Sequence, residues 1–385
     1  MDKLIVQPLK KSAISTTIVI DALDECKDEG PASAILSVLG RFVSEIPKVK
    51  SLVTGRPEPR IQEGFRLPLL TKVTDTFFLH EVEPTQVKND IQLLFRYKFS
   101  EISARQSGLD NWPTKEQLDL LCERAAGFFV HAAATVKFID YRCNNPRKQL
   151  DLLLRLPKDT VYEERTKFTT LYSLYTSILQ EAFGNDDLEN DSKVCSVLGA
   201  VILATNPLSP STIATLLGFD VEDVFSLLSS VHPLLLLQGD INSPVQPFHK
   251  SFPDFITNPI QCVNPRFQIS PPDYHLELLL DCLELMNKTL EKNMCNLPEA
   301  VKNSEVDDLQ ERREQYLNHG LQYACKSWHK HLINKHTSHV PKITSVLHHF
   351  LEEKFLFWLE VLSILGAVRD AVDALKVAIR WLEVS

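Results

Sequence analysis

Several motifs that carry chemistry are missing from this 385-residue chain. It has no glycine-rich phosphate-binding loop of the form G-x-x-x-x-G-K-[ST], no G-x-G-x-x-G, no H-E-x-x-H and no nucleophile elbow. Its eight cysteines form no C-x-x-C pair. The signatures of dinucleotide-binding proteins, zinc proteases, serine hydrolases and dithiol redox proteins are therefore all absent from the sequence.

Charge and hydropathy limit the function classes further. The chain has 41 Lys and Arg against 50 Asp and Glu, and its net charge of −9 argues against a dedicated nucleic-acid-binding protein. The longest apolar stretches, residues 125–136 and 194–204, are far shorter than the ~20 residues of a transmembrane helix. No apolar run typical of a signal peptide begins the chain. Since the cysteines are scattered, a reducing compartment suits them better than a disulfide framework. We therefore expect a cytoplasmic protein without a membrane span.

The most informative segment that is present is Ile18-Val-Ile-Asp-Ala-Leu-Asp-Glu-Cys26. Its three β-branched apolar residues indicate a short buried strand, which Asp21 closes, and Asp24 and Glu25 follow within one turn. This is the arrangement of a Walker B site, in which a carboxylate at the carboxyl end of a parallel strand holds a nucleotide-bound Mg²⁺ and a second acid orients water. Only 17 residues precede Ile18, and none of them is glycine. The sequence thus carries the metal half of a nucleotide site without the phosphate half.

Together with Ser51-Leu-Val-Thr-Gly-Arg-Pro-Glu-Pro59, this acidic segment resembles the NACHT-type NTPase domain of large fungal signalling proteins, which belong to the STAND class of nucleotide switches. The order and spacing of the segments carry the resemblance, which covers roughly residues 15–385. It continues through four further segments, Pro207–Ile213, Leu216–Phe219, Pro247–Phe255 and Tyr323–Trp328.

The resemblance implies roles for five side chains. Asp21 would contact Mg²⁺ through water, and either Asp24 or Glu25 would polarise the attacking water; the sequence does not separate these two roles. Arg56 would be the sensor near the terminal phosphate, where a permanently charged guanidinium can bridge two oxygens. His249 would contact the diphosphate and lock the resting state. Each assignment has a structural alternative. The three acids would then simply form a polar turn after the strand, Arg56 would be a surface arginine at a strand end, and His249 would be a capping or core-edge histidine.

The pattern along the chain predicts the α/β remnant of a P-loop NTPase sheet, followed by a mainly α-helical region that includes a winged helix. We expect strands at 17–21, 51–54 and 76–79, with a helix over 32–44 between the first two. From residue 84 onward the apolar spacing is helical. The expected domains are an NTPase core remnant at 1–83, a helical lid at 84–192, a winged helix at 193–260 and a helical arm at 261–385.

The winged-helix prediction rests on helices over 194–204 and 211–217, a third helix capped by Asp220, and a hairpin of strands 234–237 and 245–248. DNA binding is not expected of it, because residues 193–258 have a net charge of −3. The two lysines, without any arginine, face five carboxylates: Lys193 and Lys250 against Asp220, Glu222, Asp223, Asp240 and Asp254.

The late part of the chain is rich in histidine. Because no cysteine or carboxylate pair completes a zinc spacing, we interpret these histidines as part of a solvated helix face rather than a metal site. Seven of the 12 histidines lie there: His319, His329, His331, His336, His339, His348 and His349.

The sequence therefore favours a truncated NACHT/STAND signalling module. Its intact relatives would use ATP or ADP with Mg²⁺ in an oligomerisation switch, and protein partners or self-association are expected. Without the backbone donors of a phosphate loop, this chain alone should neither hydrolyse ATP nor bind it tightly. The rival hypothesis is a non-catalytic helical interaction scaffold with a decayed nucleotide site.

Overall fold

The computed structural model describes residues 7–11, 15–26, 29–42, 49–106, 108–140, 145–155, 169–184, 188–298, 302–332 and 340–384. The chain forms two compact units, Met1–Val82 and Glu83–Ser385. The described buried apolar residues fall into two separate clusters, one in each unit. Each unit thus has a core of its own. The charged run at 158–167, which the sequence suggests is a connector, lies outside the described residues.

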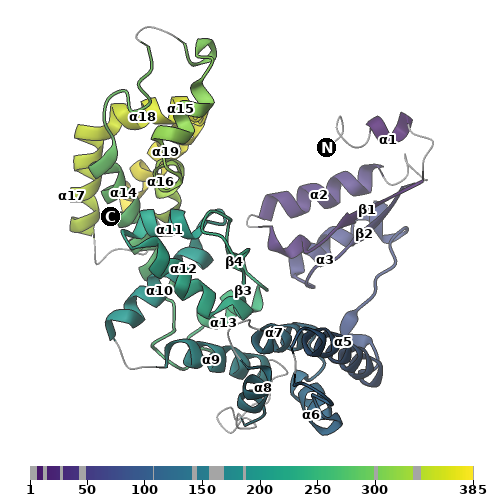
Figure 1. Cartoon of the computed structure of the whole chain (residues 1–385). Coiled ribbons are helices and arrows are strands. Elements are labelled where there is room, and N and C mark those ends of the chain that lie inside the picture. The colour runs from purple at the N-terminus through teal and green to yellow at the C-terminus, as the bar shows by residue number, and fades with distance from the viewer. Residues whose placement is uncertain are drawn as a thin grey trace. The chain divides into compact units, whose positions relative to one another are not determined.

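The first unit is a small α/β layer built on two strands (Figure 1). The strands β1 (Thr16–Ile20) and β2 (Val49–Val53) pair in parallel, with Ile20 opposite Val53. Helix α2 (Glu29–Phe42) joins them, as the predicted β-α-β pattern requires. The other elements are α1 (Gln7–Lys11), η2 (Leu23–Glu25), α3 (Pro59–Phe65), α4 (Pro68–Thr71) and η3 (Leu79–Glu81).

One face of this sheet is covered, and the described residues leave the other face open. Helices α2, α3 and α4 supply most of the buried core of the unit, which consists of Leu23, Ala32, Leu36, Ile61 and Leu70. Strand β1 alternates in burial, and the three central residues of β2 are exposed. Val19 and Leu52, which are opposite each other in the register, are 62% and 55% exposed. Parallel strands are normally apolar because both faces are buried. Here the described residues cover only one.

The predicted third strand at 76–79 is wrong. Residues 74–78 have no regular structure and lead into the 3₁₀ turn η3. Phe77 and Leu79 are 75% and 81% exposed. A strand is stable only when a neighbour completes its hydrogen-bond ladder and its apolar side chains are covered, and the described residues supply neither to this segment. Its aromatic and apolar composition alone does not make it a strand.

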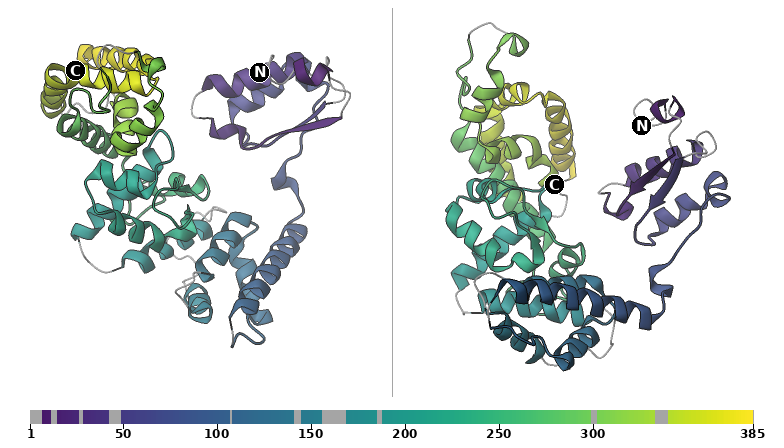
Figure 2. Two further views of the ribbon diagram at one scale, coloured as in Figure 1. Left: turned by 45° about the horizontal axis from the view of Figure 1, so that its top comes forward. Right: turned by 45° about the vertical axis from the view of Figure 1, so that its right-hand side comes forward.

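The second unit is almost entirely helical (Figures 1 and 2). Its first part contains α5 (Pro84–Arg105), α6 (Lys115–Ala125), α7 (Phe129–Ile139), α8 (Pro146–Arg155) and α9 (Thr169–Phe183). Its middle part contains α10 (Leu188–Leu203), α11 (Pro210–Leu217), α12 (Val221–Ser230), η4 (His232–Leu234), β3 (Leu235–Leu236), β4 (Gln246–Pro247) and α13 (Ser251–Ile256). Its last part contains α14 (Pro271–Thr289), η5 (Asn303–Glu305), α15 (Leu309–Tyr316), α16 (His319–His331), α17 (Val340–His349), the π-helix η7 (Phe350–Lys354), α18 (Phe355–Ile364) and α19 (Val368–Val384).

Local capping signals fix several helix ends, among them the Asp220 cap that the sequence predicted. Thr114 and Gln117 form a reciprocal capping box at the start of α6. Asp220 caps α12 by accepting from the N–H of Glu222 at 2.9 Å. Gly218 ends α11 with φ +69°, a left-handed conformation that glycine adopts without steric cost. These short-range signals need no tertiary context.

Three helices and a hairpin follow each other over residues 188–247. The predicted hairpin is confirmed, because β3 and β4 pair antiparallel through Leu235 with Pro247 and Leu236 with Gln246. An antiparallel bridge between Leu208 and Val245 ties the hairpin to the segment before α11. This order of elements is compatible with the predicted winged helix.

Within the helical arm, the apolar spacing of the sequence predicts single helices over 309–334 and 343–365, and the structure divides both. The helix expected over 309–334 is two helices, because Asn318 leaves the helical conformation and caps α16 by accepting from the N–H of Leu321 at 2.8 Å. The helix expected over 343–365 contains the π-turn η7 between α17 and α18. Trp328, Phe350 and Trp358 meet edge to face beneath that turn.

Among the described residues, no helix combines the length and the apolar character that crossing a bilayer requires.

Candidate functional site at the carboxyl edge of the sheet

The four acidic and basic residues predicted in the first unit meet at one edge of the parallel sheet. Asp21 follows β1 directly, and Arg56 lies three residues beyond the end of β2. Because the strands are parallel and in register, both chain segments leave the sheet on the same side. Backbone hydrogen bonds hold the segments together, from Thr54 N to Ile20 O and from Leu23 N to Thr54 O, each at 2.9 Å.

Thr54 organises the turn that carries Asp21. Its hydroxyl accepts a hydrogen bond from the N–H of Ala22 at 2.9 Å and donates a short one to Asp21 Oδ1. Ala22 adopts a left-handed conformation with φ 52°, which turns the chain sharply at the strand end. The Asp21 side chain is exposed, and this turn fixes its direction. A carboxylate fixed at this edge has an oxygen to offer to a ligand outside the sheet.

Asp24 has a different environment. It is only 5% exposed, and its Oδ1 accepts the backbone N–H of Arg56 at 3.1 Å while its Oδ2 lies 3.6 Å from Arg56 Nε. Arg60 donates to the Asp24 carbonyl at 2.8 Å and forms an ion pair with Glu58. Asp24 therefore fastens the β2 loop, and with it Arg56, to the end of β1.

Glu25 lies next to Asp24 but is exposed. The 3₁₀ turn η2 rotates successive side chains by about 120°, so that one acid points inward and its neighbour outward. The Arg56 side chain is 42% exposed, so its guanidinium remains partly accessible beside the acids. The edge thus presents two accessible carboxylates, those of Asp21 and Glu25, and one arginine.

These residues are of the kind that bind the Mg²⁺ ion of a Mg²⁺–phosphate complex. Mg²⁺ is commonly held by one or two carboxylates together with waters and substrate phosphates rather than by a closed protein cage. Asp21 can serve as such a carboxylate, directly or through water. Among the residues that the structure describes, no three His, Cys, Asp or Glu side chains gather as a metal site. The donor set here therefore suits a shared Mg²⁺ rather than a structural metal.

His249 belongs to the second unit, just after β4. Its Nδ1 accepts the N–H of Ser251 at 3.1 Å and lies 2.7 Å from Ser251 Oγ, which in turn contacts the Tyr175 hydroxyl at 2.7 Å. Accepting at Nδ1 puts the proton of the neutral imidazole on Nε2. The His249 ring is thus oriented by a defined local network that also starts α13.

A close pair of histidines, one of them buried, escaped the sequence interpretation. His331 is fully buried and His329 is 6% exposed, contrary to the expectation of a solvated histidine face. His331 places its Nδ1 2.9 Å from Nδ1 of His275 on α14. Its Nε2 contacts the Tyr323 hydroxyl at 2.8 Å. The helical spacing of Tyr323 and His331, both on one side of α16, was the available signal. His336 and His339 lie outside the described residues.

Comparison with known proteins gives one distant similarity. The chain is 23% identical over 384 residues to vegetative incompatibility protein HET-E-1 of Podospora anserina, an alignment that covers 94% of this chain and 26% of that protein. The chain thus spans about a quarter of this relative's length. No protein-family model matches the chain, and no solved structure matches it. The similarity supports a fungal NACHT-type family, in agreement with the resemblance of the acidic segment.

Proposed function

We propose that this chain is part of a NACHT-type signalling module whose first unit carries the metal-binding half of an ATP/ADP site. One observation carries the proposal: Asp21, Asp24, Glu25 and Arg56 converge at the carboxyl edge of a parallel strand pair. Ligands of open α/β sheets bind outside this edge. The distant similarity to a vegetative incompatibility protein supports a role in signalling.

The environments of the acids suggest how the roles divide. Asp21 would hold the nucleotide-bound Mg²⁺ through water. Glu25, which is exposed beside it, would orient the attacking water. Asp24 is buried against the Arg56 loop and would act as a positioning residue for the arginine. Arg56 would sense the terminal phosphate, because its partly exposed guanidinium can bridge two oxygens. The terminal phosphate of a bound nucleotide would supply the negative charge that binds the Arg56 guanidinium.

In the second unit, the proposed module uses the winged helix and His249. The helix–helix–helix–hairpin order over 188–247 supports the winged-helix assignment. His249 would donate from Nε2 to a phosphate oxygen of the diphosphate, since its Nδ1 already accepts from Ser251. Nucleotide exchange would then weaken this contact and favour self-association or binding of a protein partner.

The chain by itself is proposed neither to bind ATP tightly nor to hydrolyse it. The directed N–H donors and the lysine of a phosphate loop are absent from its sequence. Without them, the accessible acids Asp21 and Glu25 repel a polyphosphate unless Mg²⁺ lies between. The proposal therefore separates the metal-binding edge, which this chain has, from the phosphate cradle, which it lacks.

The test is isothermal titration calorimetry of Mg-ATP and Mg-ADP into the chain and into Asp21→Ala, with the exposed acid Glu63→Ala as the matched control. No measurable heat in any of the three proteins is expected. Micromolar binding that disappears in Asp21→Ala and persists in Glu63→Ala would contradict the inactivity and reveal another phosphate cradle. Binding that Asp21→Ala leaves unchanged would contradict the metal role of Asp21.

A second candidate function is a non-catalytic helical interaction scaffold with a decayed nucleotide site. The observation in its favour is the use of Asp24 as a structural anchor, which leaves only part of the acidic pair accessible. The nucleotide switch and the scaffold can be distinguished in a longer protein, to which an upstream segment that carries G-x-x-x-x-G-K-[ST] has been added. The switch requires that this longer protein binds Mg-ATP through Asp21 and changes its sedimentation coefficient with nucleotide, whereas a scaffold shows the same association with and without nucleotide.

A further inference from the structure

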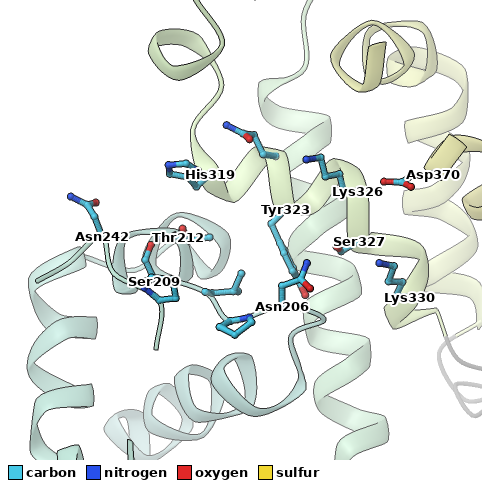
Figure 3. Close-up of a pocket in the computed structure, with 14 residues that line it drawn as sticks. Asn206, Ser209, Thr212, Asn242, His319, Tyr323, Lys326, Ser327, Lys330 and Asp370 are labelled. Atoms are coloured by element: carbon cyan, nitrogen blue, oxygen red, sulfur yellow. Dashed lines mark hydrogen bonds between the residues drawn. The ribbon is translucent and has the colours of Figure 1, made fainter. Parts of the chain in front are cut away.

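A cavity of about 380 Å³ lies within the second unit, and none of the residues proposed for nucleotide binding lines it (Figure 3). One side is formed by α16, and the opposite side by the segment leading into α11 and the loop between β3 and β4. Figure 3 shows Tyr323, Lys326, Ser327 and Lys330 along the α16 side, with Ser209, Thr212 and Asn242 across from them. A volume of this size is in the range of small-molecule sites.

The α16 side presents two positive charges. Lys326 and Lys330 are four residues apart, so their side chains are neighbours on one helix face. Among the described residues, neither ammonium group has a carboxylate within 4.0 Å, although Asp370 of α19 also lines the cavity. Two like charges at this spacing repel each other and weaken the helix slightly. An anion placed between them relieves that repulsion.

The opposite side supplies neutral hydrogen-bonding groups in fixed positions. Ser209 accepts the N–H of Thr212 at 3.2 Å and contacts the Thr212 hydroxyl at 2.8 Å, which anchors the first turn of α11. The amides of Asn206 and Asn242 line the same side. These groups match hydroxyls, which both donate and accept, better than they match a second charge.

The cavity floor is rigid. The buried Tyr323 hydroxyl accepts the N–H of Thr205 at 3.2 Å and contacts Nε2 of His331. Ser327 Oγ lies 3.1 Å from Thr205 Oγ1. These bonds hold α16 against the chain segment that precedes α11, so the two sides of the cavity keep their spacing without a ligand. Such preorganisation lowers the entropic cost of binding.

We propose that this cavity binds a small phosphomonoester of sugar-phosphate size. Lys326 and Lys330 would hold the phosphate, and Asn206 and Asn242 would meet the hydroxyls of the sugar. A phosphomonoester carries a charge of about −1.5 to −2 at neutral pH, which balances two ammonium groups better than a single carboxylate does. Lysine binds phosphate as a point charge and imposes no planar geometry on it.

The experiment is calorimetric titration of the chain with ribose 5-phosphate and, separately, with ribose, at fixed ionic strength. Ribose 5-phosphate is expected to bind with a 1:1 stoichiometry, and ribose at least about tenfold more weakly. Lys326→Gln and Lys330→Gln should each weaken binding about tenfold, because each removes one charge from the phosphate. The matched control Lys376→Gln, an exposed lysine of α19 outside the cavity, should bind as the unsubstituted chain does.

Folding and binding can be told apart in this experiment. Both glutamine variants remove a like-charge repulsion within α16, so they should unfold at the same or a higher denaturant concentration. Asp21→Ala should also bind ribose 5-phosphate normally, since Asp21 belongs to the other unit. Any one of three results overturns the proposal. Ribose 5-phosphate does not bind, ribose binds as tightly as ribose 5-phosphate, or both glutamine variants bind ribose 5-phosphate as tightly as the unsubstituted chain does. Binding of hexaglutamate in place of ribose 5-phosphate would make the cavity a site for acidic peptides and overturn it as well.

Discussion

Asp24 and Glu25 are neighbours in the sequence with opposite surroundings in the structure. Replacing Asp24 by alanine would leave the part-buried N–H of Arg56 without its acceptor, which costs about 1 kcal/mol of local stability. The ion pair adds little to this, because the Arg56 side chain is 42% exposed. Glu25→Ala should change stability by less than about 0.5 kcal/mol. Hydrogen exchange of the amides in β1 and β2 measures the difference.

Faster exchange in Asp24→Ala alone is the expected result. Equal effects of Asp24→Ala and Glu25→Ala would mean that Asp24 is not the anchor of the Arg56 loop. The sequence predicted both acids at the strand end, because the strand and the turn are local features. It did not separate them, since the inward direction of Asp24 depends on Arg56, 32 residues away.

Asp281 on α14 links stability to pH. Burial, followed by the charges of Glu277 and Glu284, raises the pKa of its carboxyl from 3.8 to about 7, while Lys342 lowers it slightly. The folded protein therefore binds this proton more tightly than the unfolded chain does. The stability from protonated Asp281 is fully present below the unfolded pKa and is lost as pH rises through about 7. The total is at most on the order of 4 kcal/mol.

Asp281→Asn should remove this dependence. We expect the variant to be more stable than the unsubstituted chain by about 1–3 kcal/mol at pH 8 and nearly equal to it at about pH 3.5, below the unfolded pKa. Urea unfolding followed by tryptophan fluorescence measures this, since all four tryptophans lie in the second unit. A variant that is less stable at pH 8 would show that ionised Asp281 has a favourable partner.

At the scale of elements, the π-turn η7 and helix α18 are joined to α16 by one aromatic side chain. Trp358 is fully buried, its ring centroid lies 5.5 Å from that of Phe350 and 6.2 Å from that of Trp328, and its Nε1 donates to the Cys325 carbonyl at 2.9 Å. Trp358→Ala should therefore destabilise the second unit by about 3–5 kcal/mol.

The matched control on the same helix is Leu356→Ala, because Leu356 is 73% exposed and its truncation should cost less than about 0.5 kcal/mol. Far-UV circular dichroism during urea unfolding compares the two variants without relying on tryptophan emission. A loss below about 1 kcal/mol for Trp358→Ala would show that α18 repacks around the cavity.

Elements were predictable from sequence where short-range signals decide them. The capping box at Thr114, the turn at Gly218 and the hairpin strands required only neighbouring residues. The break at Asn318 was missed because the apolar spacing continues across it, and the strand at 76–79 was wrongly predicted because composition says nothing about the presence of a neighbouring strand.

At the scale of the whole molecule, the sequence indicated a small α/β region followed by helices, and the structure has both. The candidate site in the first unit was predictable because parallel strands bring their ends to one edge. The cavity beside α16 was not, because its sides come from segments about 120 residues apart and its polar residues follow no known motif. The finer division of the second unit into lid, winged helix and arm stays a prediction.

The open face of the two-stranded sheet has a consequence for the protein in a cell. Val19 and Leu52 lie side by side on it, and both are more than half exposed. Chaperones and degradation enzymes act on proteins according to how much apolar surface they show. As long as this face stays uncovered, the first unit would be a substrate for such quality control. Any contact that covers Val19 and Leu52 would therefore increase the abundance of the protein.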